Sequence, residues 1–246
     1  MDEKVKQFAQ MMSESRDIVF FGGAGVSTES GIPDFRSVDG LYNQKWKYPP
    51  EVILSRSFFD AQPEEFFRFY REKLLLTGIK PSGAHKALAR LEAMERLSAV
   101  VTQNIDGLHQ DAGSHRVLEL HGSVRRNYCM KCGRFYSGEE LAGMPLVPRC
   151  ACGGMIKPDV VLYEEALDPK VLDDSIAAIS RCDMLIIGGT SLSVYPAAGL
   201  VRYFRGDHLV IINKTEIQGE RGADLVIRGS IGKTLSDAVD MLEGGI

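Results

Sequence analysis

The stretch Ile18-Val-Phe-Phe-Gly-Gly-Ala-Gly-Val-Ser-Thr28 decides the fold that this chain is expected to adopt. Its first four residues are apolar and predict a buried strand, the glycines from Gly22 to Gly25 predict a tight turn, and small polar residues follow. A strand, a glycine-rich turn and small residues in this order are typical of a nucleotide-binding βα unit. The stretch matches only the first part of the G-x-G-x-x-G fingerprint, because its sixth position is Thr28, so an ordinary strand-to-helix turn is the alternative.

Outside this unit, short apolar runs recur along the chain, and most of them are continuous rather than alternating. Continuous runs predict strands that are buried on both faces, as in a parallel sheet covered by helices. Helical patterns fall between several of the runs, and this alternation predicts an α/β fold with a doubly wound, Rossmann-like parallel sheet. The expected strands are 18–21, 99–102, 117–120, 160–162, 184–187, 209–212 and 225–227, and the expected helices are one near the N-terminus, one from about 63, and 82–96, 169–180, 196–205 and 231–242.

The segment from Arg125 to Pro158 interrupts the alternation with many glycines and prolines and four cysteines. The cysteines form two pairs separated by 17 residues, Cys129-x-x-Cys132 and Cys150-x-Cys152. Four thiolates delivered from two tight turns suit a tetrahedral Zn²⁺ site, and no histidine or carboxylate stands beside them to activate water. We therefore expect a structural zinc site, with buried free thiols or two disulfides as the alternatives. The fifth cysteine, Cys182, precedes an apolar run and is expected in the core.

Polar residues follow several of the expected strands. In a doubly wound sheet the carboxyl ends of the strands meet at one crevice, where ligands bind. His121 lies where a catalytic base would stand, whereas His85, His115 and His208 have no such placement. The residues that the pattern brings to the crevice are Gln103, Asn104, Ile105, Asp106, His121, Gly189, Thr190, Ser191 and Asn213.

The composition is that of an ordinary globular protein, because 44% of the 246 residues are hydrophobic and 25% are charged. The longest apolar stretch, 18–26, has nine residues, far fewer than the ~20 that a bilayer span needs. The N-terminus lacks the apolar core of a signal peptide, and an odd number of cysteines suggests a reducing compartment, so we expect a cytoplasmic protein without a membrane partner. A net charge of −4 argues against nucleic acid as the main partner. Neither oligomeric state nor a protein target follows from these observations.

At these residues the sequence resembles the sirtuins, the Sir2-type NAD-dependent protein deacylases. The matching segments occur in the order of the family and are Gly23-Ala-Gly-Val-Ser27, Gly31-Ile-Pro-Asp-Phe-Arg36, Thr102-Gln-Asn-Ile-Asp-Gly-Leu-His109, Leu120-His-Gly122, the two cysteine pairs and Gly189-Thr-Ser-Leu192. The resemblance implies one catalytic domain, with a Rossmann core over about 1–35, 78–124 and 158–246. A smaller lobe would come from a helical insertion, about 36–77, and a zinc ribbon, about 125–157.

The resemblance also implies roles for single residues toward NAD as co-substrate, with Zn²⁺ structural at Cys129, Cys132, Cys150 and Cys152. The cofactor-binding residues that it implies are Ala24, Gly25 and Thr28 at the diphosphate, Phe35 and Arg36 at the reacting carbon and the phosphate, Gln103, Asn104, Ile105 and Asp106 at the nicotinamide and its ribose, His121 beside that ribose, Gly189, Thr190, Ser191 and Asn213 at the adenosine, and Ile231 near the adenine. His121 would be the general base and Asn104 its catalytic neighbour. Val161, Leu162 and Tyr163 would contact the acetyl-lysine peptide.

The implied reaction is deacetylation of lysine side chains, which releases nicotinamide and O-acetyl-ADP-ribose. Sirtuins that remove succinyl groups carry a Tyr-x-x-Arg pair in the helical insertion, and its counterpart here, Phe67-x-x-Tyr70, has no cation, so an uncharged acyl group is favoured. One departure lies in the peptide-binding segment, where the family usually has glycine and this chain has Glu164. The alternatives are protein ADP-ribosylation at the same NAD site, a nicotinamide dehydrogenase, and a nucleic-acid-binding zinc ribbon.

Overall fold

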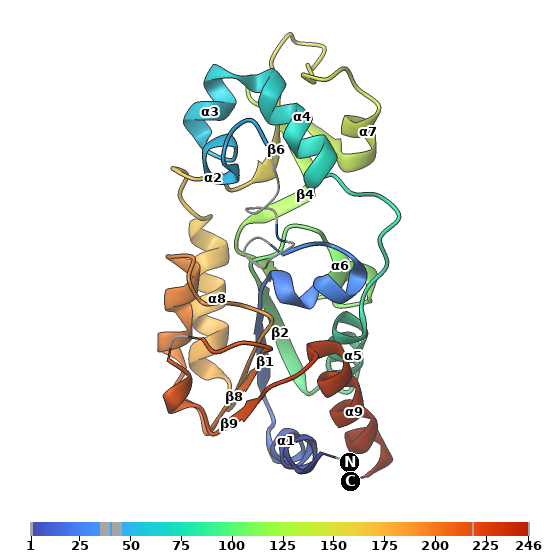
Figure 1. The fold of residues 1–246 in the computed structure, drawn as a ribbon, viewed down its shortest axis with the longest axis vertical. Coiled ribbons are helices and arrows are strands. Elements are labelled where there is room, and N and C mark those ends of the chain that lie inside the picture. The colour runs from blue at the N-terminus through green and yellow to red at the C-terminus, as the bar shows by residue number, and fades with distance from the viewer. Residues whose placement is uncertain (1, 35–39, 41–45, 218, 246) are drawn as a thin grey trace.

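The computed structural model describes residues 2–34, 40, 46–217 and 219–245, which form a larger and a smaller lobe (Figure 1). The larger lobe is built on a six-stranded sheet with the order β3-β2-β1-β7-β8-β9, and every neighbouring pair is parallel. The strands are β1 (Ile18–Gly22), β2 (Leu97–Thr102), β3 (Val117–Glu119), β7 (Met184–Gly188), β8 (His208–Ile212) and β9 (Leu225–Ile227). The expected doubly wound parallel sheet is confirmed.

Helices cover both faces of this sheet (Figure 1). Alternate residues of β1 enter two separate cores: Phe20 packs with α1, α5 and α9, whereas Phe21 packs with α8 and the 3-10 helix η4. Each strand side chain therefore finds apolar partners whichever way it points, which explains the continuous apolar runs. The covering helices are α1 (Glu3–Glu14), α5 (Gly83–Ala93), α8 (Pro169–Arg181), η4 (Ala197–Tyr203) and α9 (Ile231–Gly244).

Capping side chains fix where several of these helices begin. The side chains of Asp2, Asp168 and Ser230 accept backbone N–H groups at the starts of α1, α8 and α9. Two expected helices differ from the structure. The helix expected over 82–96 ends at Ala93, and the one expected over 196–205 is the shorter 3-10 helix η4.

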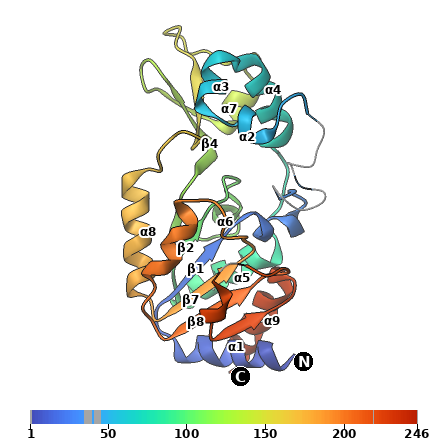
Figure 2. The same ribbon diagram turned by 60° about the vertical axis from the view of Figure 1, so that its left-hand side comes forward.

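The smaller lobe combines a three-stranded antiparallel sheet, order β5-β4-β6, with four helices among the described residues (Figure 2). Its elements are α2 (Pro50–Ile53), α3 (Arg56–Ala61), α4 (Pro63–Lys73), β4 (Gly122–Cys129), β5 (Phe135–Ser137), α7 (Gly138–Ala142) and β6 (Ile156–Val160). Aromatic residues of α3 and α4 pack against the sheet and two of the cysteines in one apolar core.

The prediction that residues 160–162 form a strand of the parallel sheet was wrong. Instead, β6 ends at Val160 and pairs antiparallel with β4 in the smaller lobe. Its burial alternates, with Ile156, Pro158 and Val160 inward, as in a strand with one face covered. Both β4 and β6 run across the expected lobe boundaries at 124/125 and 157/158, so the two lobes share continuous strands there.

In the described part of the chain, short helices near the sheet's carboxyl edge are η1 (Ala24–Val26), η2 (Thr28–Ser30) and α6 (Leu108–Asp111), and η5 (Glu220–Gly222) precedes β9. Within the described residues, none of the helices has both the length and the apolar character to cross a bilayer.

Candidate active site

The glycine turn after β1 packs directly against the turn after β7. The Gly25 N–H donates to the Gly189 carbonyl over 2.8 Å, and a Cβ added to Gly25 would lie 2.8 Å from the Gly189 Cα. Gly189 itself has a φ of +59°, which glycine adopts without steric cost. Glycine is therefore required at both positions for the two strand ends to close together.

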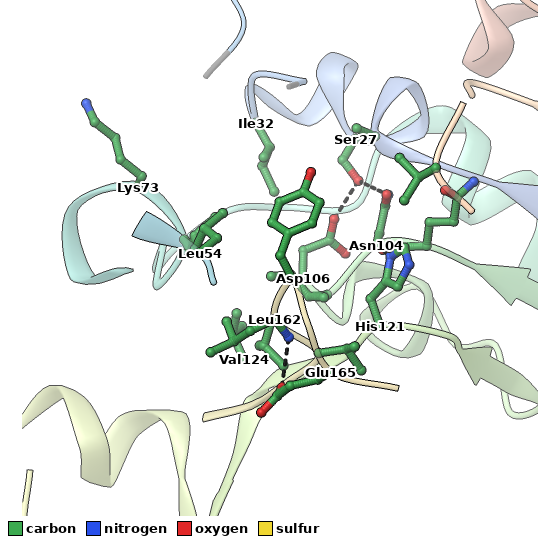
Figure 3. A pocket seen from close by; sticks show the side chains of 18 of the residues that line it. Ser27, Ile32, Leu54, Lys73, Asn104, Asp106, His121, Val124, Leu162 and Glu165 are labelled. Atoms are coloured by element: carbon green, nitrogen blue, oxygen red, sulfur yellow. Dashed lines mark hydrogen bonds between the residues drawn. The ribbon is translucent and has the colours of Figure 1, made fainter. Parts of the chain in front are cut away.

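Three polar side chains from two separate loops are hydrogen-bonded together beside this turn (Figure 3). The Ser27 hydroxyl donates to the Asp106 carboxylate over 2.7 Å and accepts from the Asn104 amide over 3.0 Å. The other Asp106 oxygen accepts the Leu108 N–H at the start of α6. Asn104 and Asp106 are thus held in fixed orientations, because each is anchored to Ser27.

His121 follows β3 and has a defined tautomer. Its Nδ1 lies 2.9 Å from the Gln103 carbonyl oxygen, which can only accept, so Nδ1 carries the proton and Nε2 has a free lone pair. Burial lowers the pKa of His121 below its ordinary value of 6.5, and the hydrogen bond to Gln103 opposes this in part. At neutral pH the imidazole is therefore uncharged and able to accept a proton at Nε2.

A pocket joins these groups to the smaller lobe. Its walls come from the carboxyl edge of the parallel sheet, the end of α4, the segment that leaves β6, and the loop after β7. Nine residues that the sequence singled out line it together: Ala24, Gln103, Asn104, Ile105, Asp106, His121, Val161, Leu162 and Tyr163.

The remaining described candidates lie along neighbouring strand ends rather than in the pocket wall. Thr190 accepts a hydrogen bond from the Gln103 amide over 3.0 Å, and the Asn213 amide donates to the Thr215 carbonyl over 3.0 Å. Ile231 is only 4% exposed and packs in the core beside α1 and α5. Gly25, Thr28, Gly189 and Ser191 belong to the same edge, whereas Phe35 and Arg36 lie outside the described residues.

Phe67 and Tyr70, the pair compared with the succinyl-binding residues, are fully buried in the core of the smaller lobe. Among the described residues that line the pocket, one is a lysine at the end of α4, Lys73. Its ammonium group lies 2.8 Å from the Glu72 carboxylate and over the ring of Trp46, which leaves it engaged away from the catalytic groups. The pocket therefore offers no free cation from these positions for a carboxylate-bearing acyl group.

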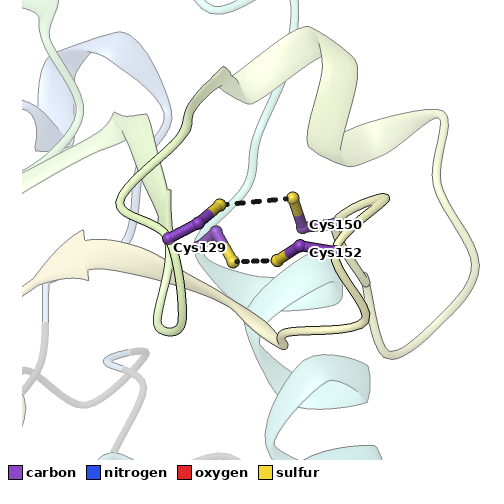
Figure 4. A group of neighbouring side chains, drawn as sticks. Cys129, Cys150 and Cys152 are labelled. Atoms are coloured by element: carbon purple, nitrogen blue, oxygen red, sulfur yellow. Dashed lines mark hydrogen bonds between the residues drawn. The ribbon is translucent and has the colours of Figure 1, made fainter.

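The four cysteines of the smaller lobe come together as expected (Figure 4). Their sulfur atoms all lie within 4.8 Å of one another, with Cys129 and Cys152 at 3.5 Å and Cys132 and Cys150 at 3.7 Å. Four sulfurs at about 2.3 Å from one Zn²⁺ in a tetrahedron are roughly 3.8 Å apart, whereas a disulfide brings two sulfurs to about 2.05 Å. The cluster fits a structural zinc ion.

Glycines shape the two turns that carry these thiols. Gly133 and Gly153 have φ values of +71° and +82°, and a Cβ on Gly154 would lie 2.7 Å from the Cys129 sulfur. None of the four cysteines is among the described residues that line the pocket, which agrees with a structural rather than a catalytic metal. Cys182 is buried in the core of the larger lobe, as expected.

Comparison with known proteins identifies the family. The model of the Sir2 family matches residues 23–196 of the chain. The chain belongs to the Sir2 family. The match includes the glycine turn, the residues that line the pocket and the cysteine cluster. The family assignment therefore depends on the same residues that form the candidate active site.

Relatives of the Sir2 family match over the whole chain. An NAD-dependent protein deacetylase of Clostridium perfringens (strain 13 / Type A) is 58% identical over 98% of this chain and 100% of its own length. A second, from Clostridium acetobutylicum, is 55% identical over 96% of this chain and 98% of its own length. A solved structure described as a Sir2 enzyme superimposes with a TM-score of 0.90 at 38% identity and covers 100% of both chains. A Sir2 structure with a p53 peptide and NAD+ gives a TM-score of 0.85 at 39% identity and covers 100% of this chain and 99% of that one.

Several residues of the pocket have no role that the sequence alone predicts. Ser27 was quoted in a motif, but its bonds to Asn104 and Asp106 depend on how two distant loops meet. Tyr195 and Pro196 line the pocket in the loop that follows β7. An aromatic residue next to a proline in the loop after a buried strand is the sequence signal that could have indicated a role for them. Leu54 and Lys73 come from the smaller lobe, and no local pattern places them at the pocket.

Proposed function

We propose that this chain is an NAD-dependent protein-lysine deacetylase, which removes acetyl groups from lysine side chains and releases nicotinamide and O-acetyl-ADP-ribose. The observation that carries the proposal is the neutral His121, with Nε2 free, in one pocket with the anchored pair Asn104 and Asp106. The curated relatives that match the whole chain carry the same activity in their names.

The residues at the carboxyl edge of the sheet fit a dinucleotide. The close contact of Gly25 with Gly189 brings two backbone turns together without side chains between them, which suits a diphosphate laid along the η1 turn. Thr190 and Asn213 would hold the adenosine half, and Gln103 and Asn104 the nicotinamide ribose. When bound, NAD supplies the ribose carbon that receives the acetyl oxygen and nicotinamide as the leaving group.

Asp106 would bind the carboxamide of the nicotinamide. Both of its oxygens already accept hydrogen bonds, one from Ser27 and one from Leu108, but each carboxylate oxygen can accept more than one. Ser27 and the start of α6 thereby hold the carboxylate in place before the ligand arrives. This preorganisation lowers the entropic cost of orienting the nicotinamide.

His121 would act as general base on a ribose hydroxyl. Nε2 would accept the proton while the Nδ1–H group keeps its hydrogen bond to the Gln103 carbonyl oxygen. That hydrogen bond stabilises the imidazolium that forms. Because the pKa of His121 is lowered by burial, the basic form predominates at neutral pH. The neighbouring Asn104 amide, fixed by Ser27, orients the ribose relative to this base.

Acetyl-lysine would enter from the side of β6. Val160, Val161 and Leu162 line that part of the pocket and would exclude water from a bound acetyl group. The Val161 N–H donates to the His121 carbonyl over 3.0 Å, so the peptide-binding segment is hydrogen-bonded to the catalytic segment itself. The peptide would contact this segment at Val161, Leu162 and Tyr163, which all line the pocket.

Incubation with an acetyl-lysine peptide tests the proposal. We expect mass spectrometry to find free lysine and acetylated ADP-ribose with NAD, and unchanged peptide without it. ADP-ribose attached to the peptide, with the acetyl group retained, would instead establish ADP-ribosyl transfer. Deacetylation that does not depend on NAD would refute the proposal.

We further propose a structural Zn²⁺ in the smaller lobe and a cytoplasmic location. Four cysteines held as a thiolate cluster suit a reducing compartment, where disulfides are rare. Metal analysis of the purified protein should give about one zinc per chain.

A further inference from the structure

The segment after β6 makes a tight turn in which Glu164 takes a position that normally requires glycine. The Glu165 N–H donates to the Leu162 carbonyl over 3.0 Å, which closes a four-residue turn. Glu164, the third residue, has a φ of +76°. A type II turn needs a positive φ at this position, and a residue with a Cβ adopts it only at a cost in free energy. A strained backbone at a binding site points to a function for the side chain.

The Glu164 side chain is held in a fixed place. Its two carboxylate oxygens accept from the N–H and the hydroxyl of Ser57 in α3, each over 2.9 Å. These bonds use one acceptor site on each oxygen, and a carboxylate offers about four in all. The residue remains exposed, so the carboxylate can still accept a hydrogen bond or an ion pair from a ligand.

The charges around Glu164 leave its own charge uncompensated. Arg56 pairs with Asp60 and Glu165, and Lys157 pairs with Glu165. With Glu164, this group has three carboxylates and two cations, so one negative charge is in excess. Among the described residues, no ion pair includes Glu164.

Glu164 lies at the rim of the pocket that the peptide would enter. It lines the pocket together with Tyr163 and Tyr195, two residues that are 40% and 65% exposed. Tyr163 is already paired on one side, because its N–H donates to Leu54 and its carbonyl accepts from Arg56. A peptide that enters the pocket would therefore meet a wall with a fixed carboxylate and two exposed tyrosines, and carboxylates and aromatic faces both attract a cation.

We propose that Glu164 is a specificity-determining residue that favours substrates with an arginine or lysine close to the acetyl-lysine in sequence. This inference rests on the proposed deacetylase function and adds the class of peptide to it. The turn and the hydrogen bonds to Ser57 fix the carboxylate at the pocket wall. The excess negative charge around it would attract a cation of the substrate.

The test compares matched peptides. Acetyl-lysine peptides would carry a single arginine at one of the three positions on either side of the acetyl-lysine, and each would be paired with the same peptide carrying glutamine there. The measured quantity is the ratio of kcat/KM for the two peptides in one enzyme. For the wild-type enzyme we expect a ratio of about two to five at one or more positions at low salt, falling toward one at high salt.

Four variants separate the effect of the Glu164 charge from the effect of its backbone conformation. Glu164→Gln removes the charge and keeps the shape, Glu164→Gly also relieves the strained φ, and both should bring the ratio to about one. Ser57→Ala removes one hydrogen bond but keeps the charge, so the preference should persist. Glu64→Gln, at an exposed carboxylate of α4 outside the pocket wall, should leave the ratio as in the wild type.

A wild-type ratio of one at every position, or a preference that persists in Glu164→Gln, would overturn the inference. Because the glutamine peptides measure deacetylation without a cation, failure of the proposed function is distinguishable: no peptide would then react in any variant. Melting temperature and zinc content of each variant show whether it has folded.

Discussion

At the scale of single residues, the chemistry depends on one imidazole whose two nitrogens have different tasks. His121 donates from Nδ1 to the Gln103 carbonyl and leaves Nε2 free in the pocket. We expect His121→Ala to lower kcat about 10²–10⁴-fold, because general-base catalysis is lost, while NAD binding changes little. Deacetylation rates and calorimetric titration with NAD measure the two effects. The exposed His115→Ala is the matched control, and near-normal turnover of His121→Ala would refute the assignment.

The same residue predicts a pH dependence. Burial lowers the pKa of His121, so the neutral, basic form still predominates just below pH 6.5, where an exposed histidine would be more than half protonated. Activity should therefore fall only as the pH drops through this lowered pKa. The pH profile of kcat/KM, which reports the free enzyme, should place its acidic limb below 6.5. A limb centred above 6.5 would contradict the burial argument.

At the scale of elements, the contact between the turns after β1 and β7 tolerates no side chain. We expect Gly25→Ala to destabilise the fold by about 1–3 kcal/mol, because the new Cβ would meet the Gly189 backbone at 2.8 Å and backbone cannot move aside cheaply. It should also weaken NAD binding. Thermal melting and titration with NAD check both effects. Gly222→Ala, where a Cβ meets nothing within 4 Å, is the control; equal melting temperatures for the two variants would count against this packing.

The helices α5 and α6 are in contact through two buried histidines, His85 and His109. The His85 and His109 rings lie 4.6 Å apart, and burial lowers their pKa values to about 4 and about 3. Between pH 6.5 and these values the unfolded chain binds more protons than the folded one, so stability must fall as the pH drops. For His85 alone the loss by pH 4 is about 3 kcal/mol.

Chemical denaturation between pH 7 and pH 4 tests this pair. The free energy of unfolding of the wild type should decrease through this range, and His109→Phe should decrease less steeply because one buried imidazole is gone. Exposed His115→Gln should follow the wild type. Parallel curves for the wild type and His109→Phe would show that the buried pair does not cause the loss.

The elements also show what local sequence could predict. The strand at 18–22 and the cysteine pairs were predictable, because burial on two faces and thiolate spacing each leave a local pattern. The prediction assigned the end of β6 to the wrong sheet, because its short apolar run does not indicate which sheet the strand joins. The anchoring of Asn104 by Ser27, the turn at Glu164 and the buried His85 depend on contacts between segments far apart in the chain, which a single sequence does not record.

At the scale of the whole molecule, we expect the smaller lobe to depend on a metal ion as well as on apolar packing. Cys129 and Cys150 belong to the same buried cluster as the aromatic residues of α3 and α4, so the thiolate cluster is part of that core. The parallel sheet has two separate cores of its own, neither of which includes a cysteine of the cluster, so we expect it to persist without the metal. The two lobes are joined through β4, which begins at Gly122, directly after His121. Loss of metal should therefore reach the active site through this strand.

We accordingly expect a chelator, or Cys152→Ser, to remove about one zinc per chain and to unfold the smaller lobe while the parallel sheet persists. Hydrogen exchange measures this directly: the amides of β4, β5 and β6 should lose protection, and those of β1, β7 and β8 should keep it. Deacetylation should fall because His121 and the Val161 segment lose their shared hydrogen bond. Cys182→Ser, at the buried cysteine outside the cluster, should keep its zinc. Unchanged exchange in β4 to β6 after metal removal would mean that apolar packing alone holds the lobe, and the metal would then have no structural role.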